Sequence, residues 1–364
     1  MKKEAKITVL LLTVLFIGFS VICWIKPAAE YSETERRKLD QFPKLTIESI
    51  AKGEFMTDFE GYTMDQFPMR DRFRSLKAWV SQAIFRKSDN NDIYVADGYA
   101  VKMEYPLKEE SLVYAGERFG KVYEKYLKNN EGKIYLSLIP DKNYFLAEPS
   151  GHLSMDYSQL FETMQKEMPY AEVIDITDLL SIEDYYKTDV HWRQENLVDI
   201  AERIGSSMGI TLSGNYEVKT LEDDFYGVYF GQSALNLSGE PLHYLTNEVL
   251  ESCSVYNYEN SQMMGIYDMK KAKGNDPYEI FLSGPVSLLK IENPKAATEK
   301  ELIVFRDSFG SSLIPLLAEG YQTITLVDIR YIQSDFLTNF VDFQDKDVLF
   351  LYSAVVLANS ETLK

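Results

Sequence analysis

Three residues far apart in the chain carry the side chains that acyl transfer through a serine requires. Asp189 and His191 stand two positions apart in the stretch Lys187-Thr188-Asp189-Val190-His191-Trp192, and Ser308 follows much later. In this chemistry a serine hydroxyl attacks an acyl carbon, a histidine takes the hydroxyl proton, and a carboxylate orients the histidine. The residue types therefore indicate an acyl-transfer site with Ser308 as nucleophile, His191 as base and Asp189 as orienting acid.

The two-residue spacing of Asp189 and His191 has a simple structural consequence if the segment is extended. Side chains at positions i and i+2 of a strand point to the same face, so the carboxylate and the imidazole lie side by side. A pair of this kind is also common as a surface or capping feature, and this second interpretation stays open.

Ser308 is predicted to lie where a strand over 301–305 meets a helix over 311–318. Ligands of open α/β folds bind at this edge, where strands end and helices begin. Backbone N–H groups at the start of the helix can stabilise an oxyanion, and Gly310 permits close approach. The alternative is that Ser308 or Asp307 is only the N-cap of the helix.

The wider pattern predicts an α/β fold with a mostly parallel sheet flanked by helices. Asp97-Gly98 marks a hairpin, and the stretch 210–298 interrupts the alternation with turn signals typical of an inserted β-rich segment. The expected strands cover 133–139, 171–176, 301–305, 323–327 and 347–352, and the expected helices 111–126, 156–168, 194–208 and 311–318.

The N-terminus has the pattern of a membrane-spanning helix. A basic tip precedes an apolar run from Ile7 to Ile25, which is about the 20 residues that a helix needs to cross a bilayer. The basic flank favours the cytoplasm and places the rest of the chain outside. A cleaved signal peptide is the alternative, with Ala28-Ala29 as the candidate cleavage site. We expect a signal-anchor over 1–26, a helical collar over 27–91, and an α/β domain over 92–364.

Composition limits the functional classes. The chain has 364 residues, 45% of them hydrophobic, and a formal net charge of -18. This charge argues against nucleic acid or anionic lipid as the main partner, since both require clustered Lys and Arg. Cys23 lies in the apolar run, so Cys253 is expected to be unpaired, and His152 and His243 lie far from His191 in sequence. The sequence therefore predicts no metal site and no cofactor.

Several blocks together resemble the DHHW family of bacterial exported proteins, which is similar to the SGNH-like domains of alginate O-acetylation proteins. The blocks are 33–43, 65–71, 139–144, 187–192 and 306–312. The resemblance implies an SGNH-hydrolase-like fold in which Asp189 and His191 precede Ser308, the reverse of the usual order. Val190 departs from the family pattern, because it stands where the first of two histidines is expected.

The resemblance also suggests where substrate binds. The Ser308 N–H is expected in the oxyanion hole, with Asn143 and Gly227 as further candidates. Tyr186 and Trp192, beside the histidine, are either a platform for a sugar or part of the core.

The expected function is that of a membrane-anchored extracytoplasmic serine acyltransferase or esterase, which adds acetyl groups to a cell-surface glycan or removes them. Its partners would be an acyl donor, the glycan and a membrane-bound O-acyltransferase. The alternative is a non-catalytic SGNH-like scaffold or glycan-binding protein in polysaccharide assembly.

Overall fold

The computed structural model describes residues 3–364 and divides them into two compact units. The first unit contains the described residues up to Asn91 together with Phe230–Leu237. The second unit contains Asp92–Tyr229 and Ser238–Lys364. The return of Phe230–Leu237 to the first unit is a feature that the sequence pattern does not indicate.

The second unit is built around an eight-stranded sheet with the order β11-β10-β12-β14-β13-β15-β6-β7. The five strands from β14 to β7 are parallel to one another. They are β6 (Ile134–Ile139), β7 (Glu172–Val173), β13 (Glu301–Arg306), β14 (Thr323–Val327) and β15 (Asp347–Ser353). The mostly parallel sheet is thus as predicted, although β7 is reduced to two residues.

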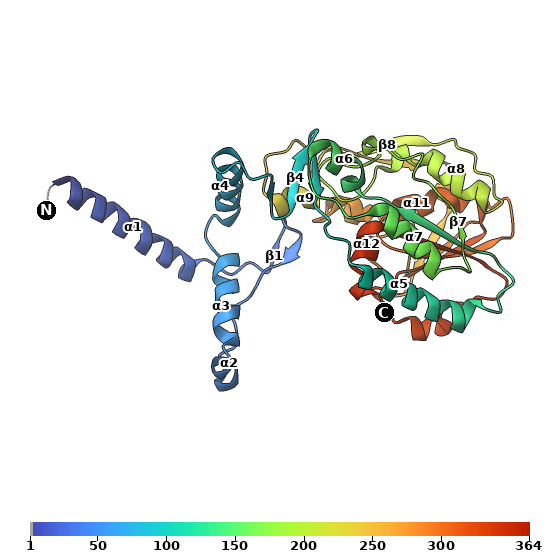
Figure 1. The fold of residues 1–364 in the computed structure, drawn as a ribbon, viewed down its shortest axis with the longest axis horizontal. Coiled ribbons are helices and arrows are strands. Elements are labelled where there is room, and N and C mark those ends of the chain that lie inside the picture. Colours follow the sequence, from blue (N-terminus) through green and yellow to red (C-terminus); the bar gives the residue numbers. More distant parts are fainter. Residues whose placement is uncertain (1–2) are drawn as a thin grey trace. The chain divides into compact units, whose positions relative to one another are not determined.

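Helices cover both faces of this sheet (Figure 1). Alternate residues of β13 point to opposite faces, so Leu302 and Val304 join one core and Ile303 and Phe305 join the other. Helices α8 and α11 pack on the first face, and α5, α7 and α12 on the second. The helices of this unit are α5 (Glu109–Val122, continued by a π-helical turn over Tyr123–Leu127), α6 (Lys142–Ser150), α7 (Tyr157–Glu167), α8 (Val198–Ser207), α10 (Glu248–Ser252), α11 (Gly310–Leu317) and α12 (Ala354–Ala358).

The predicted inserted segment is β-rich and antiparallel, as its turn signals indicate. One part is a hairpin of β8 (Glu217–Phe225) and β9 (Glu240–Thr246). The other part extends the central sheet, because β12 (Leu288–Glu292) pairs antiparallel with β14. Strands β10 (Ser254–Asn257) and β11 (Gln262–Met264) then continue this edge. The predicted hairpin at Asp97-Gly98 joins β4 (Ile93–Ala96) to β5 (Tyr99–Lys102).

The first unit consists of short elements that follow a long apolar helix. Helix α1 (Lys3–Ile25) has 23 residues, an 18-residue window with a mean hydropathy of 2.5 and no buried side chain, so its length and composition suit a membrane span. The other elements are β1 (Tyr31–Ser32), β2 (Arg37–Lys38), α2 (Ile47–Ala51), α3 (Glu54–Asp65), α4 (Arg70–Ala83) and β3 (Asp89–Asn90). Helix α9 (Val228–Ser233) begins in the second unit and ends in the first.

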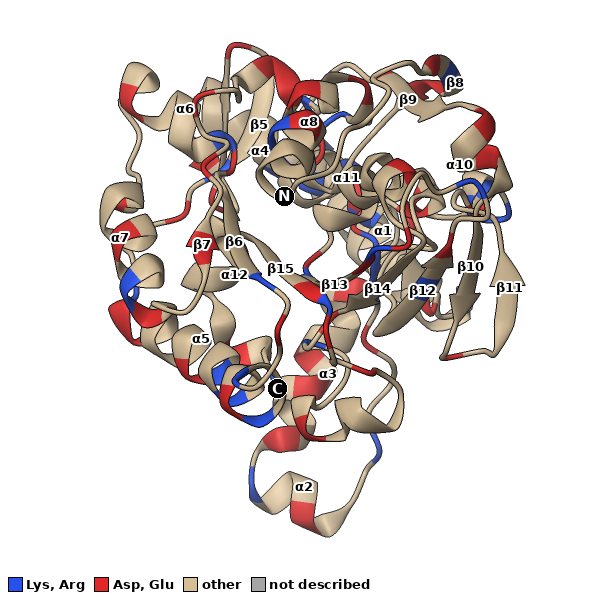
Figure 2. Cartoon of the chain, turned by 90° about the vertical axis from the view of Figure 1, so that its right-hand side faces the viewer, with Lys and Arg blue, Asp and Glu red and all other residues tan. Residues whose placement is uncertain are grey.

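Acidic and basic residues are interspersed along many of the helices and loops (Figure 2).

Candidate active site

Asp189 and His191 are in contact, but they do not lie on a strand as predicted. Residues 187–191 form bends, flanked by an isolated bridge between Tyr185 and Trp192. The Asp189 Oδ1 atom accepts the His191 backbone N–H at 3.0 Å and lies 2.6 Å from its Nδ1. A tight turn closed by the aspartate side chain, not strand geometry, therefore brings the two groups together. An ionised carboxylate only accepts hydrogen bonds, so Nδ1 carries the proton and Nε2 is free to act as a base.

The Asp189 carboxylate is held from its other side by the chain at Gly227 and Val228. The Val228 N–H donates to Asp189 Oδ2 at 2.9 Å, and the Gly227 N–H donates to Thr188 Oγ1 at 2.9 Å. A Cβ atom at Gly227 would lie 2.2 Å from Asp189 Cβ, so only glycine fits here. Gly227, predicted as an oxyanion donor, instead has its N–H occupied and supports the loop that carries Asp189.

The His191 ring lies between aromatic side chains. It stacks on Tyr278 with 4.2 Å between ring centroids and an interplanar angle of 7°, and the Phe309 ring lies 5.3 Å away. The Tyr278 hydroxyl donates to Ser312 Oγ at 2.8 Å, which fixes the stacked ring in place. The His191 Nε2 atom is buried and has no hydrogen-bond partner among the described residues. A buried, unpartnered ring nitrogen aimed away from its carboxylate partner is suited to accept a proton from a reacting group.

Ser308 lies in the turn between β13 and α11, as predicted. Asp307 is the residue that secures this turn, because its Oδ1 accepts the Phe309 N–H at 3.0 Å and its Oδ2 accepts the Ser353 N–H at 2.8 Å. Asp307 thus closes the turn ahead of α11, while the N-cap residue of the helix is Phe309, which makes no side-chain capping bond. Ser308 is half-buried, and within residues 3–364 its hydroxyl makes no hydrogen bond.

Trp192 joins the two halves of the candidate site. Its Nε1–H lies 3.0 Å from the Phe309 carbonyl oxygen and 2.9 Å from Ser312 Oγ. The residue after the histidine is thus bonded to the residue after the serine. The structure brings the two motifs together in this way, without a hydrogen bond between the Ser308 hydroxyl and His191 Nε2.

Three residues predicted to contact substrate are fully buried in the structure. Trp192 and Tyr186 are both fully buried, so neither presents a ring face to a sugar, and the core interpretation holds. Asn143 is also buried; its Oδ1 accepts from the Tyr94 hydroxyl at 2.9 Å and its Nδ2 donates to the Leu153 carbonyl at 3.4 Å. All three side chains support the site from within the core.

Lys142 is a buried lysine at the site that the sequence analysis did not single out. Its Nζ donates to the carbonyl oxygens of Tyr186 at 2.9 Å and Lys187 at 3.2 Å, and it lies 5.0 Å from the Tyr229 ring centre. Burial lowers the pKa of this lysine to about 7, against the attraction of Asp189 and other carboxylates. Its place directly after β6 and Asp141 was the available sequence signal, since polar residues at that edge face the site.

The remaining histidines lie elsewhere. His152 stacks on Tyr94, and the Nδ1 atom of His243 contacts the Thr220 hydroxyl. Within residues 3–364 no group of three or more His, Cys, Asp and Glu side chains is arranged to hold a metal ion.

Comparison with protein-family models and with curated protein sequences gives no match. Solved structures do match. A DHHW family protein from Eubacterium siraeum has a TM-score of 0.63 and 18% identity over 75% of this chain and 95% of that one. Bacillus cereus PatB1 has a TM-score of 0.58 and 19% identity over 73% of this chain and 96% of its own, and a second PatB1 structure has a sulfonyl adduct. The O-acetyltransferase domain of Pseudomonas putida AlgJ matches with a TM-score of 0.44 and 11% identity. The chain thus shares its fold with a DHHW family protein and PatB1, which confirms the predicted resemblance.

Proposed function

We propose that the chain is an extracytoplasmic, SGNH-like serine O-acyltransferase or esterase that acts on a cell-surface glycan. The observation that carries this proposal is the Asp189–His191 pair, whose unpartnered Nε2 lies beside the turn that contains Ser308. A protonated Nδ1 and an unpartnered Nε2 are what a general base in serine acyl transfer requires.

In the proposed reaction Ser308 Oγ attacks the carbonyl carbon of an acyl donor while His191 Nε2 takes the hydroxyl proton. The tetrahedral intermediate collapses to an ester on Ser308, and the leaving group departs with the proton from Nε2. A glycan hydroxyl or water, deprotonated by the same nitrogen, then attacks the ester and releases Ser308. Asp189 stabilises the imidazolium in both steps. The Ser308–His191 hydrogen bond forms in the substrate complex, because such contacts are commonly long in free enzymes.

The location follows from helix α1 in this proposal. We place its basic tip in the cytoplasm and the second unit outside, where cell-surface glycans lie. A membrane-bound O-acyltransferase that brings acyl groups across the membrane is the proposed supplier of the donor.

The first experiment asks whether Ser308 is a nucleophile. The purified chain is treated with a fluorescent fluorophosphonate and assayed for 4-nitrophenyl acetate turnover. The sulfonyl adduct of PatB1 makes a sulfonyl fluoride a reasonable second probe. We expect Ser308→Ala to abolish labelling and turnover without a change in Tm, whereas Ser207→Ala, at an exposed serine of α8, changes neither. Labelling that persists in Ser308→Ala contradicts the proposal.

The second experiment concerns the acceptor. The O-acetyl content of wall polymers is compared among cells with the gene, without it, and with the Ser308→Ala variant. Loss of acetyl groups in the last two indicates a transferase, and a gain indicates an esterase.

A non-catalytic scaffold is the second candidate, because the Ser308 hydroxyl and His191 Nε2 are not hydrogen-bonded in the structure. It is favoured if neither probe labels the chain, 4-nitrophenyl acetate is not turned over, and Ser308→Ala leaves wall polymers unchanged while deletion alters them.

A further inference from the structure

Helix α4 has its polar side inward and its apolar side outward. Ala78 and Ser81 are buried, and Arg70 and Arg74 on the same side are only 17% exposed. On the opposite side lie Phe73, Leu76 and Trp79, which are 41%, 52% and 59% exposed and follow one another at three-residue spacing. In a helix that packs on a protein core the apolar stripe faces that core. This stripe is instead largely exposed, and only Phe73 at one end of it packs against other aromatic rings of the first unit.

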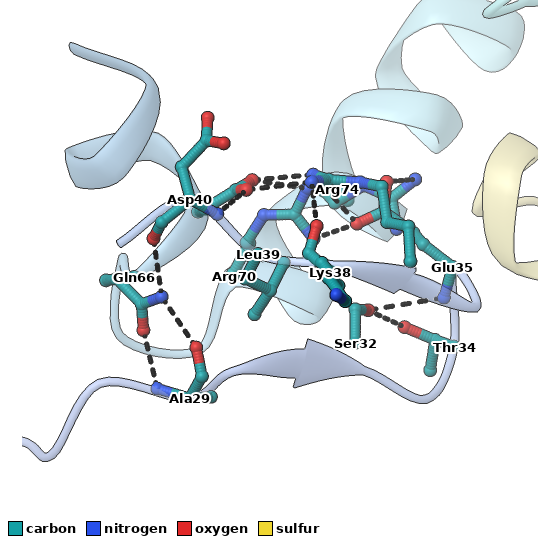
Figure 3. Close-up of polar contacts among 12 residues, drawn as sticks. Ala29, Ser32, Thr34, Glu35, Lys38, Leu39, Asp40, Gln66, Arg70 and Arg74 are labelled. Atoms are coloured by element: carbon teal, nitrogen blue, oxygen red, sulfur yellow. Dashed lines mark hydrogen bonds and ion pairs between the residues drawn. The ribbon is translucent and has the colours of Figure 1, made fainter. Parts of the chain in front are cut away.

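An ionic cluster beneath α4 fixes this orientation (Figure 3). Arg70 and Arg74 both contact the carboxylate of Glu35, and Arg70 also lies 3.3 Å from Asp65. Arg74 further donates to the Gly231 carbonyl at 2.9 Å. Turning the apolar stripe inward would break all of these contacts and leave the largely buried Glu35 carboxylate without Arg70 and Arg74, which is costly. The outward direction of the stripe is therefore built into the first unit.

The stripe is continuous with the apolar helix α1. The Phe19 ring of α1 stacks on Phe67 with 5.5 Å between centroids, and it lies edge-on to Phe73 at 5.9 Å. Trp24 of α1 also lines a cavity of about 760 Å³ with Phe59, Phe67 and Phe73. The exposed apolar face of α4 thus adjoins α1, the helix whose length and composition suit a membrane span.

The local charge of this segment favours an anionic membrane over a protein as the partner of the apolar face of α4. The chain as a whole has a net charge of -18, yet residues 70–87 contain six basic residues and one acidic residue. Four of the basic residues are exposed, namely Arg72, Lys77, Arg86 and Lys87. Exposed aromatic and aliphatic side chains among Lys and Arg are typical of helices that lie in the interface of anionic bilayers. The acidity of the whole chain argued against anionic lipid, but this segment is a local exception.

We propose that α4 and residues 84–87 lie in the headgroup region of an anionic membrane leaflet, with Phe73, Leu76 and Trp79 inserted toward the acyl chains. The proposal rests on the extracytoplasmic, membrane-bound location given above for the proposed function. It adds a second membrane contact on the outer side, so that the first unit is held against the lipid surface rather than tethered by α1 alone.

Trp79 provides the test, since the chain has only two other tryptophans, Trp24 in α1 and the buried Trp192. The full chain with Trp24→Phe is reconstituted in vesicles of phosphatidylcholine and phosphatidylglycerol with dibrominated acyl chains, which quench tryptophan on contact. We expect at least a twofold greater quenching than in Trp24→Phe/Trp79→Phe, in which only Trp192 emits. Leu76→Asp should reduce this quenching, and Val113→Asp, at an exposed apolar position of α5, should not.

Two results would overturn the proposal. Blue-shifted but unquenched Trp79 emission would show that a second copy or another protein covers the helix. Quenching by aqueous iodide, with none by brominated lipid, would leave the helix in water. Failure here is separable from failure of the proposed function, because turnover of 4-nitrophenyl acetate reports on Ser308 and resistance to carbonate extraction reports on α1.

Discussion

At the scale of single residues, Asp189 is the group on which the candidate site depends most. It accepts bonds from both the backbone and the ring of His191, and its second oxygen accepts from Val228. An asparagine keeps the shape but presents an amide, which favours the wrong tautomer of His191. We expect Asp189→Asn to lower kcat for 4-nitrophenyl acetate by about 10²–10⁴-fold.

The melting temperature is the control for this variant. Oδ1 of asparagine can still accept the Val228 N–H, so Tm should change by no more than a few degrees. Full activity in Asp189→Asn would remove Asp189 from the triad, and a large fall in Tm would assign it a structural role.

Tyr278 shows what the sequence could not reveal at this scale. It stacks on His191 from the inserted segment, and neither spacing nor a motif connects the two residues. The contact exists because the insertion folds back over the site, so only the tertiary structure shows it. Ser308, by contrast, lay in a strand-to-helix pattern that local sequence was sufficient to recognise.

At the scale of elements, the local pattern of apolar residues was sufficient to predict the buried strands of the central sheet. The strands β13, β14 and β15 were recognised because their residues are buried on both faces, as parallel strands in a covered sheet are. The segment around Asp189 was misassigned as extended, because its bend is made by one side-chain hydrogen bond. The pairing of β12 with β14 could not be predicted from the sequence either, since strand order depends on contacts between residues that are distant in the chain.

Helix α6 (Lys142–Ser150) supports the Asp189 loop through Lys142, which donates to the carbonyls of Tyr186 and Lys187. Burial lowers its pKa to about 7 from the ordinary 10.5. Between these values the unfolded chain binds the proton more tightly, so the contribution of this group to stability is present at high pH and lost as pH falls through 7. We expect wild-type stability, relative to Lys142→Met, to rise by up to about 1.4 kcal/mol per pH unit above pH 7.

Urea unfolding at pH 7, 8 and 9 measures this difference, with Lys121→Met on α5 as an exposed control. Parallel pH profiles for wild type and Lys142→Met would show that Lys142 is charged throughout. Because the Asp189 loop loses a support, kcat for 4-nitrophenyl acetate should also fall in Lys142→Met but not in Lys121→Met.

At the scale of the whole molecule, the candidate site and the proposed membrane contact belong to different units. Asp189, His191 and Ser308 lie in the second unit, and α1 and α4 in the first. Each unit also contains a tryptophan outside α1, Trp79 in the first and Trp192 in the second. In the Trp24→Phe background, the emission of Trp79 therefore reports on the first unit and that of Trp192 on the second. Because the chain has two units, its unfolding need not be a single two-state transition.

The ionic cluster of the first unit makes this independence testable. Asp65 accepts two hydrogen bonds from Arg37, at 2.8 and 2.6 Å, and one from the Asp40 N–H at 2.9 Å. The hydrogen bonds from Arg37, the largest cause, lower the pKa of the Asp65 carboxyl below its ordinary 3.8, although burial opposes this. Its stabilisation is therefore complete above the unfolded pKa and lost as pH falls through the folded one.

We expect Asp65→Asn to destabilise the first unit by about 2 kcal/mol at pH 7, and by less as pH falls below the ordinary 3.8 of an aspartate, because the unfolded wild-type chain then binds a proton that the folded chain still excludes. The Trp79 transition should shift to lower urea concentration, while the Trp192 transition and ester turnover stay unchanged, since both report on the second unit. Asp58→Asn, at an exposed position of α3, is the matched control. If both tryptophan signals shift together, the two units unfold as one, and a change in the first unit would then reach the candidate active site.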